Sequence, residues 1–207
     1  MLPPQNLISL PYLNKSSHFS SIILASNSPR RKKLLEKIGI TFEIIPSSID
    51  EDFSVDLSPV DFAKHYAEKK AKFISSKYPR SLVIGADTIV VYNNSILGKP
   101  LDIEDAFSML EKLSGNTHTV ITGVSLQLSV NSVSKTFYSK TDVTIKNLSR
   151  EEIQYYIENY RPLDKAGSYG IQEWFSVYVE KIEGCYFNVM GLPLSKLYKE
   201  MGNIIIG

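Results

Sequence analysis

The chain has 207 residues, of which 43% are hydrophobic and 22% charged, as is ordinary for a globular protein with a sizeable core. A formal charge of +1 excludes a global field that would hold nucleic acid or a membrane surface, so any affinity for anions must be local. The single cysteine, Cys185, excludes an internal disulfide and fits a reducing compartment. Residues 1–20 lack the apolar run of a signal or membrane span, which predicts a loosely ordered extension and a cytoplasmic protein.

The first predicted elements are a strand and a helix joined by a polar turn. Residues 21–25 are apolar and rich in branched side chains, which is typical of a strand. Ser28 is a suitable N-cap for a helix that begins at Pro29, and Gly39 is a suitable end. The turn therefore carries polar and basic side chains at the start of a helix.

A second helix and a buried strand are predicted next. Ser58 and Asp61 form a pair that resembles a capping box, and the apolar side of the following helix includes Lys70, a position that needs a reason. Residues 82–92 indicate a buried β segment. We expect residues 85–88 to interrupt this segment, because they place a carboxylate between two apolar runs.

The rest of the chain continues to alternate between strands and helices. Asn93 and Asn94 are typical of a hairpin turn. The further predicted elements are a helix capped by Asp102, strands at 120–128 and 135–145, a helix opened by a capping box at 149–152, a hairpin that turns at 183–184 with its second strand at 186–189, and a helix at 193–201. This order indicates an α/β fold with a mixed sheet, in which residues 21–207 form a single domain with two lobes.

The first candidate site is the turn that contains Ser26, Ser28, Arg30 and Arg31. A helix start carries free N–H groups and a partial positive charge, and arginine forks match phosphate oxygens. Two cations at a helix N-terminus oppose the helix dipole, so an anion is expected to compensate them. The alternative is a solvated basic turn.

The second candidate is Asp87, which is flanked by buried strand residues. Burying a carboxylate costs several kcal/mol unless it is paired, hydrogen-bonded or bound to a metal, and a divalent cation is a natural partner. The acidic residues 50–52, which include Glu51, supply further carboxylates. The alternatives are an aspartate that caps a β-bulge and an acidic loop that is merely solvated.

Two further candidates are loops with constrained or permissive backbones. Lys99 lies between a glycine and a proline at residues 98–100, which fixes the position of a cation. Residues 164–172 include two glycines and end at Gln172, whose amide offers both a donor and an acceptor to a nucleobase edge. The alternative in both cases is an ordinary structured loop.

Taken together, these segments resemble the Maf family of nucleotide pyrophosphatases over nearly the whole chain from Ile22 to Met201. The resemblance rests on ASxSPRR at 25–31, GADTIV at 85–90, GKP at 98–100, SGxxHxVxT at 114–122, DKAGxYGIQ at 164–172 and FNVMGLP at 187–193. It implies a long mixed β-sheet flanked by helices around a central cleft, similar to the inosine triphosphate pyrophosphatases, and a homodimer as a common state. It also implies hydrolysis of a nucleoside triphosphate to the monophosphate and pyrophosphate.

The resemblance implies roles for individual residues. Asp87 matches the family's proton acceptor, and Arg30, Thr88 and Gln172 match the positions that determine specificity. The Tyr-Gly-Ile-Gln form of the motif at 164–172 is similar to that of the branch that prefers dTTP and UTP. One departure is Glu173, which stands where many members have glycine, and the two aromatic residues after it replace a glycine-rich continuation.

A mechanism follows from these residue types. We expect Ser26, Arg31, Lys70 and Lys99 to contact the phosphates of the substrate. Asp87, with Glu51 as a second ligand, is expected to hold Mg²⁺ or Mn²⁺ and to accept a proton from the water that attacks the α-phosphorus. Two alternatives stay open: a regulator of cell division that senses nucleotides or nucleic acid without turnover, and an enzyme for modified pyrimidine nucleotides.

Overall fold

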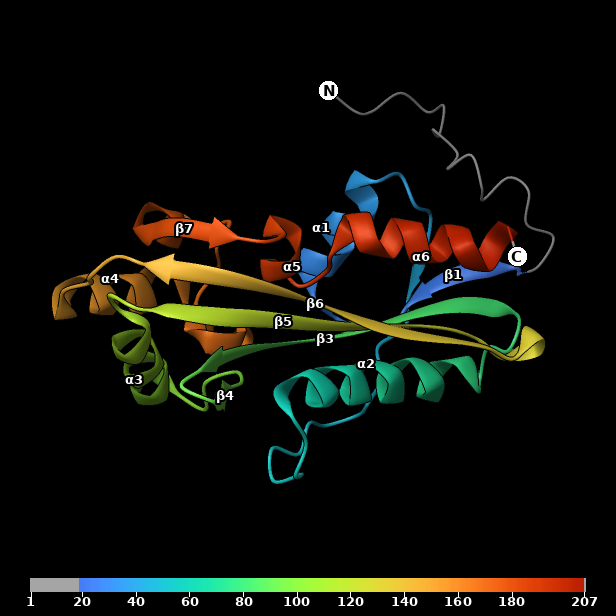
Figure 1. Cartoon of the computed structure of the whole chain (residues 1–207), viewed down its shortest axis with the longest axis horizontal. Coiled ribbons are helices and arrows are strands. Elements are labelled where there is room, and N and C mark those ends of the chain that lie inside the picture. The colour runs from blue at the N-terminus through green and yellow to red at the C-terminus, as the bar shows by residue number, and fades with distance from the viewer. Residues whose placement is uncertain (1–18, 207) are drawn as a thin grey trace.

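The structure, a computed structural model, describes residues 19–206 and has a seven-stranded mixed sheet at its centre (Figure 1). The order is β2-β1-β3-β5-β6-β7, with β4 paired to β3; β1 runs parallel to β2 and β3, and the other pairs are antiparallel. The predicted α/β fold with a mixed sheet is thereby confirmed. The strands are β1 (Ser21–Leu24), β2 (Glu43–Ile44), β3 (Ser81–Tyr92), β4 (Ser95–Leu97), β5 (Thr117–Leu128), β6 (Val133–Ile145) and β7 (Val179–Glu183).

The predicted helix starts are confirmed by their capping bonds. The side chains of Ser28, Ser58, Asp102 and Ser149 each accept a hydrogen bond from the backbone N–H three residues later, and Ser149 completes a capping box. The helices are α1 (Pro29–Lys37), α2 (Pro59–Ser75), α3 (Ile103–Leu113), α4 (Arg150–Tyr160), α5 (Tyr186–Val189) and α6 (Leu194–Ile206). The predicted extension at residues 1–20 lies outside the described residues except for its last two.

Helices cover both faces of the sheet. Figure 1 shows α2 along one face and α1 and α6 along the other. Successive side chains of β3 enter the two cores in turn: Leu82 and Ile84 pack in the cluster that includes residues of α1 and α6, and Val83 packs against α2. The alternation places the site residues of β3 on different sides of the sheet.

The predicted interruption of the third strand is wrong. β3 pairs with β5 in an unbroken register from Val83 to Val91, so Asp87 is an ordinary member of a long strand and caps no bulge. The hairpin turn after this strand is confirmed, since Asn93 and Asn94 both have positive φ, as a two-residue turn into β4 requires.

The predicted hairpin at the end of the chain is also wrong. Its first arm, β7, pairs with β6 at the edge of the sheet, and its expected second arm is the short helix α5. The buried side chain of Asn188 in α5 donates to the Val120 carbonyl at 3.1 Å and to the Thr141 hydroxyl at 3.0 Å. These bonds tie the segment to β5 and β6, so its backbone does not form a strand.

Candidate active site

A cavity of about 390 Å³ lies where β1 ends, beside an edge of β3. β3 pairs with β1 as far as Ile84 and with β4 from Val90, so among the described strands only β5 pairs with the stretch between them. All six motif segments contribute to the wall, although they are far apart in the sequence. The cavity is lined by every predicted site residue: Ser26, Arg30, Arg31, Glu51, Lys70, Asp87, Thr88, Lys99 and Gln172.

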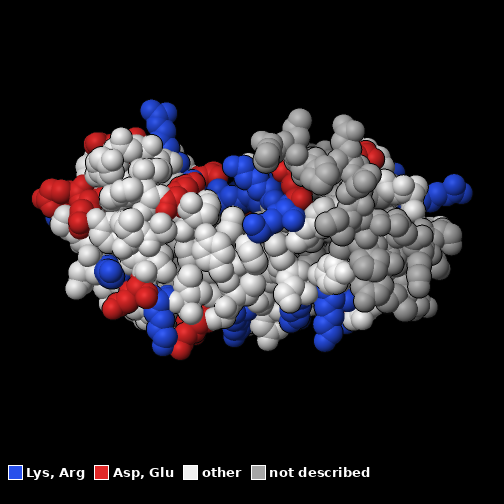
Figure 2. All heavy atoms as spheres, turned by 90° about the horizontal axis from the view of Figure 1, so that it is seen from above, with Lys and Arg blue, Asp and Glu red and all other residues white. Residues whose placement is uncertain are grey.

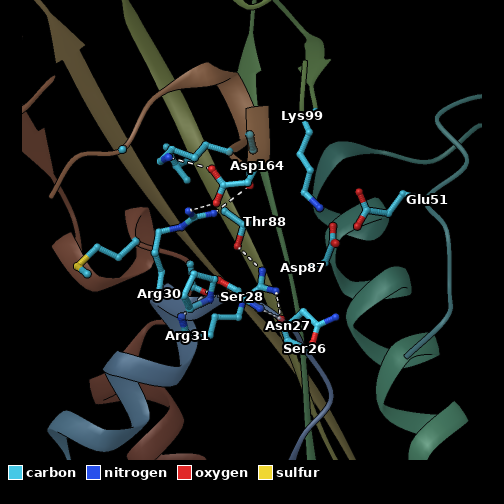
Figure 3. A pocket seen from close by; sticks show the side chains of 18 of the residues that line it. Ser26, Asn27, Ser28, Arg30, Arg31, Glu51, Asp87, Thr88, Lys99 and Asp164 are labelled. Atoms are coloured by element: carbon cyan, nitrogen blue, oxygen red, sulfur yellow. Dashed lines mark hydrogen bonds and ion pairs between the residues drawn. The ribbon is translucent and has the colours of Figure 1, made fainter. Parts of the chain in front are cut away.

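Asp87 and Thr88 are neighbours in β3 whose side chains face opposite sides of the sheet. Both line the cavity, because between Ile84 and Val90 one edge of β3 has no neighbouring strand among those described. The cavity therefore extends around this edge to both sides of the sheet. Figure 3 shows the result: Glu51 and Lys99 lie on the Asp87 side, and Arg30, Arg31 and Ser26 lie on the Thr88 side. The site therefore has one acidic and one basic wall around a single strand.

Helix α2 reaches the acidic wall because two glycines let it approach the sheet. A Cβ atom at Gly85 would lie 2.3 Å from the Ala67 carbonyl oxygen, and one at Gly123 would lie 2.2 Å from the Ala63 carbonyl oxygen. Only glycine permits this contact between helix and strand backbones. The close approach explains the lysine on the apolar side of the helix, since it brings Lys70 to the carboxylates.

Lys70 joins two carboxylates from different segments. Its Nζ donates to the Glu51 Oε1 at 2.5 Å and to the Asp87 Oδ1 at 2.6 Å. Asp87 is only 2% exposed, and its other oxygen, Oδ2, is buried with no hydrogen-bond partner in the described structure. A buried carboxylate oxygen without a partner is costly, which marks Oδ2 as a contact point for a ligand.

The two carboxyl groups titrate differently. Burial raises the pKa of Asp87 to about 6; the nearby Lys70 opposes this shift, and the charge of Glu51 adds to it. Burial also acts to raise the pKa of Glu51, but the positive charge of Lys70 and its hydrogen bond to Glu51 outweigh this effect, so the pKa of Glu51 lies below its ordinary value. Between them, Asp87 is the group poised to exchange a proton near neutral pH.

Arg31 is held in the basic wall by neutral acceptors alone. Its guanidinium donates to the Gly191 carbonyl at 2.9 Å, the Ser26 hydroxyl at 3.0 Å and the Thr88 hydroxyl at 3.0 Å. No ion pair to Arg31 occurs among residues 19–206. Burial lowers the pKa of this guanidinium, so the fixed cation favours an anionic ligand.

Arg30, unlike Arg31, forms an ion pair. It pairs with the Asp164 carboxylate at 2.6 Å and donates to the Asp164 carbonyl at 3.0 Å. Asp164 also pairs with Lys165 at 2.8 Å. These contacts fasten the loop that carries Gln172 to the start of α1. Arg30 therefore links two segments of the chain, whereas Arg31 has no anionic partner among the described residues.

Positive charge at the site is local. On the face shown in Figure 2, lysine and arginine side chains gather near the middle with acidic groups beside them. Lys99 is exposed, forms no ion pair within the described chain, and extends toward Asp87 and Glu51 (Figure 3). It remains available to a ligand.

The sequence did not indicate all the residues that shape this site. Lys165 lines the cavity, and it and Glu173 contact one another at 3.3 Å beside Gln172. Glu173 was visible only as a departure from the family pattern, and no spacing rule predicts that it bonds its neighbour's amide. Met190 and Gly191 line the cavity from the last motif without any chemical signal of their own.

Fold and site together define an α/β protein whose cavity is lined by cationic side chains and a buried carboxylate. The chain belongs to the Maf family: the pattern described as "Maf-like protein" matches residues 21–204. This confirms the resemblance drawn from the motifs. Within residues 19–206, no helix combines the length and hydrophobicity that a bilayer crossing requires.

Several relatives are similar over nearly their whole length. The "dTTP/UTP pyrophosphatase" of Geobacillus sp. (strain WCH70) is 51% identical over 87% of this chain and 96% of its own. The protein of the same name from Thermosipho africanus (strain TCF52B) is 51% identical over 86% and 90%, and that from Bacillus cytotoxicus is 47% identical over 86% and 93%. Among solved structures, the Staphylococcus aureus Ham1 protein matches 61% of this chain and 72% of its own at 14% identity with a TM-score of 0.37.

Proposed function

We propose that this protein hydrolyses dTTP and UTP to the nucleoside monophosphate and pyrophosphate, in the cytoplasm. One observation carries the proposal: the unpartnered Oδ2 of Asp87 lies in the same cavity as Arg31, a cation without an anionic partner among the described residues. A ligand that is both polyanionic and hydrolysable satisfies both groups. The names of the relatives supply the base and the reaction class.

Cations on both walls of the cavity supply the contacts for the phosphates. Arg31 presents a fixed guanidinium, the Ser26 hydroxyl lies 3.0 Å from it, and Lys99 adds a flexible cation. Because Arg31 is held by three neutral acceptors before any ligand arrives, it needs no reorganisation to bind an oxyanion. Lys70, which pairs with both carboxylates, also lines the cavity and is placed to contact a phosphate oxygen.

The acidic wall fits a divalent cation that is shared with the substrate. Magnesium sites commonly use one or two carboxylates together with substrate phosphates, and Asp87 and Glu51 are such a pair in the lining of the cavity. When bound there, Mg²⁺ or Mn²⁺ would neutralise charge on the triphosphate and on the departing pyrophosphate.

Asp87 accepts the proton in the proposed reaction. With a pKa of about 6 it is mostly ionised at neutral pH, yet basic enough to take a proton from water. Lys70 holds Oδ1, which leaves Oδ2 for the water. The water oxygen bonds to the α-phosphorus, the bond from that phosphorus to the bridging oxygen breaks, and pyrophosphate leaves with the electron pair.

A substrate panel tests the proposal. We expect pyrophosphate release from dTTP and UTP with Mg²⁺ or Mn²⁺, far less from ATP and GTP, and a loss of at least about 100-fold in Asp87→Asn. Modified pyrimidine triphosphates belong in the same panel, because the base pocket alone does not rank them. Tight nucleotide binding without metal-dependent turnover would contradict the proposal and indicate the alternative, a regulator without turnover.

A further inference from the structure

Gln172 and Glu173 are neighbours in the sequence whose side chains also touch. The Gln172 Nε2 donates to the Glu173 Oε1 at 3.3 Å. Gln172 lines the cavity, and its other amide atom, Oε1, is buried without a hydrogen-bond partner in the described structure. A buried amide oxygen without a partner costs free energy, so it favours a ligand that brings a donor.

The carboxylate decides which way round the amide lies. The two ends of a glutamine amide are similar in shape, and hydrogen-bond chemistry distinguishes them. An ionised carboxylate only accepts hydrogen bonds, so the amide nitrogen must face Glu173. The oxygen must then face away from Glu173, and the amide cannot turn over without bringing two acceptors together.

The Glu173 carboxylate is itself fixed by its surroundings. Lys165 Nζ lies 3.3 Å from its Oε1, and the Tyr156 hydroxyl donates to its Oε2 at 3.2 Å. That hydroxyl accepts from the Gly170 N–H at 3.0 Å. A Cβ atom at Gly170 would lie 2.9 Å from the carboxylate, so glycine at this position makes room for it. The acceptor that orients Gln172 is therefore a built part of the loop.

We infer that Glu173 is a positioning residue that makes the site select a pyrimidine with an N–H donor where its base meets Gln172. The inference rests on the proposed function and names the basis of its base selectivity. Uracil and thymine carry an N3–H group, which the Gln172 Oε1 accepts. Cytosine has an unprotonated acceptor nitrogen at N3, so two acceptors would meet at the Gln172 Oε1 and no hydrogen bond could form. Glu173 thereby discriminates against cytosine nucleotides through another residue, without touching the base.

The test compares UMP and CMP binding at equilibrium in three forms of the full chain. We expect the wild type to bind UMP about tenfold more tightly than CMP, the worth of one matched against one mismatched hydrogen bond. Glu173→Ala frees the amide to turn over, and the ratio should fall to within about threefold. Glu173→Gln keeps an oxygen that can accept from both Gln172 and Lys165, so it should retain most of the ratio. Glu180→Ala, the same kind of change on the exposed β7, is the control.

The ratio separates positioning from general damage, because a loosened loop weakens both nucleotides alike. An unchanged ratio in Glu173→Ala, or a wild type that does not distinguish UMP from CMP, would overturn the inference. UTP turnover, measured alongside, tests the proposed function separately: UTP turnover with an unchanged ratio sinks the inference alone, and UMP-selective binding without turnover sinks the proposed function alone. A wild type that binds neither nucleotide contradicts both.

A chemical probe keeps the test open if Glu173→Ala does not fold. 3-Methyluridine monophosphate lacks the N3–H donor but keeps the uracil carbonyl groups. We expect it to bind the wild type at least about tenfold more weakly than UMP, and its binding to Gln172→Ala to differ from that of UMP by much less. Equal binding of the two nucleotides by the wild type would overturn the inference.

Discussion

Lys70 Nζ lies 2.6 Å from the Asp87 Oδ1 and also pairs with Glu51, so a single cation holds both carboxylates of the acidic wall. The opposite Asp87 oxygen has no partner in the described structure. This arrangement divides the carboxylate into a fixed atom and a free atom. The bond from Lys70 to Oδ1 fixes the position of Oδ2, and burial raises the pKa of the carboxyl group.

The first prediction concerns the stability cost of Asp87. Burial raises its pKa to about 6, above its value in the unfolded chain, so the protonated form fits the folded protein better. The contribution of Asp87 to stability is thus fully present below about pH 4 and lost as the pH rises through about 6. Asp87→Asn, which stays neutral, should raise the free energy of unfolding by roughly 2–3 kcal/mol at pH 8 and by little at pH 4. Urea denaturation of the metal-free protein at both pH values measures this; a less stable variant at pH 8 would contradict it.

The second prediction concerns the pH dependence of turnover. The charge of Lys70 lowers the pKa of Asp87 against the effect of burial. Lys70→Met should therefore move the acidic limb of the kcat/KM profile for UTP to higher pH, by about one unit or more. Lys69→Met, at the exposed neighbouring position, is the control and should leave the limb in place. A limb that stays unchanged in Lys70→Met would show that Asp87 is not the titrating group.

The third prediction concerns the role of Arg31. Arg31 has only neutral partners among the described residues, whereas Arg30 is paired with Asp164. Arg31→Ala should lower kcat/KM for UTP by about 10- to 100-fold, because a charge-assisted contact to phosphate is lost. Lys32→Ala, at the next and exposed position of α1, should change kcat/KM less than about twofold. Similar losses in the two variants would argue against a phosphate contact at Arg31.

The fourth prediction concerns the contact between α2 and the sheet. A Cβ atom at Gly123 would meet the backbone of α2 at 2.2 Å, and backbone cannot move aside as a side chain can. Gly123→Ala should therefore cost about 3 kcal/mol or more of folding stability and withdraw Lys70 from Asp87. Gly98→Ala is the matched control for stability, because its Cβ would meet only the ring of the half-exposed Phe53. Thermal unfolding compares the two; equal midpoints would show that the helix yields easily.

Several parts of the fold followed from local rules. Ser28, Asp102 and Ser149 cap helices as predicted, because a capping bond spans only three residues and depends on little else. Asn93 and Asn94 form their turn for the same reason. The prediction of a strand at residues 186–189 was wrong, because a short strand and a short helix can have similar apolar patterns. Hydrogen bonds to the distant β5 and β6 hold the segment instead.

The sequence by itself determined the chemistry available to this protein: its motifs carry a carboxylate in a strand, cations at a helix start and in a constrained loop, and an amide at the end of a glycine-containing loop. Only the tertiary structure decided which of these groups meet. Lys70 reaches Asp87 because two glycines in different strands admit α2, and the cavity unites Asp87 with Thr88 because β1 ends early beside β3. Such contacts join segments far apart in the chain, where no local propensity acts, so packing alone fixed the site.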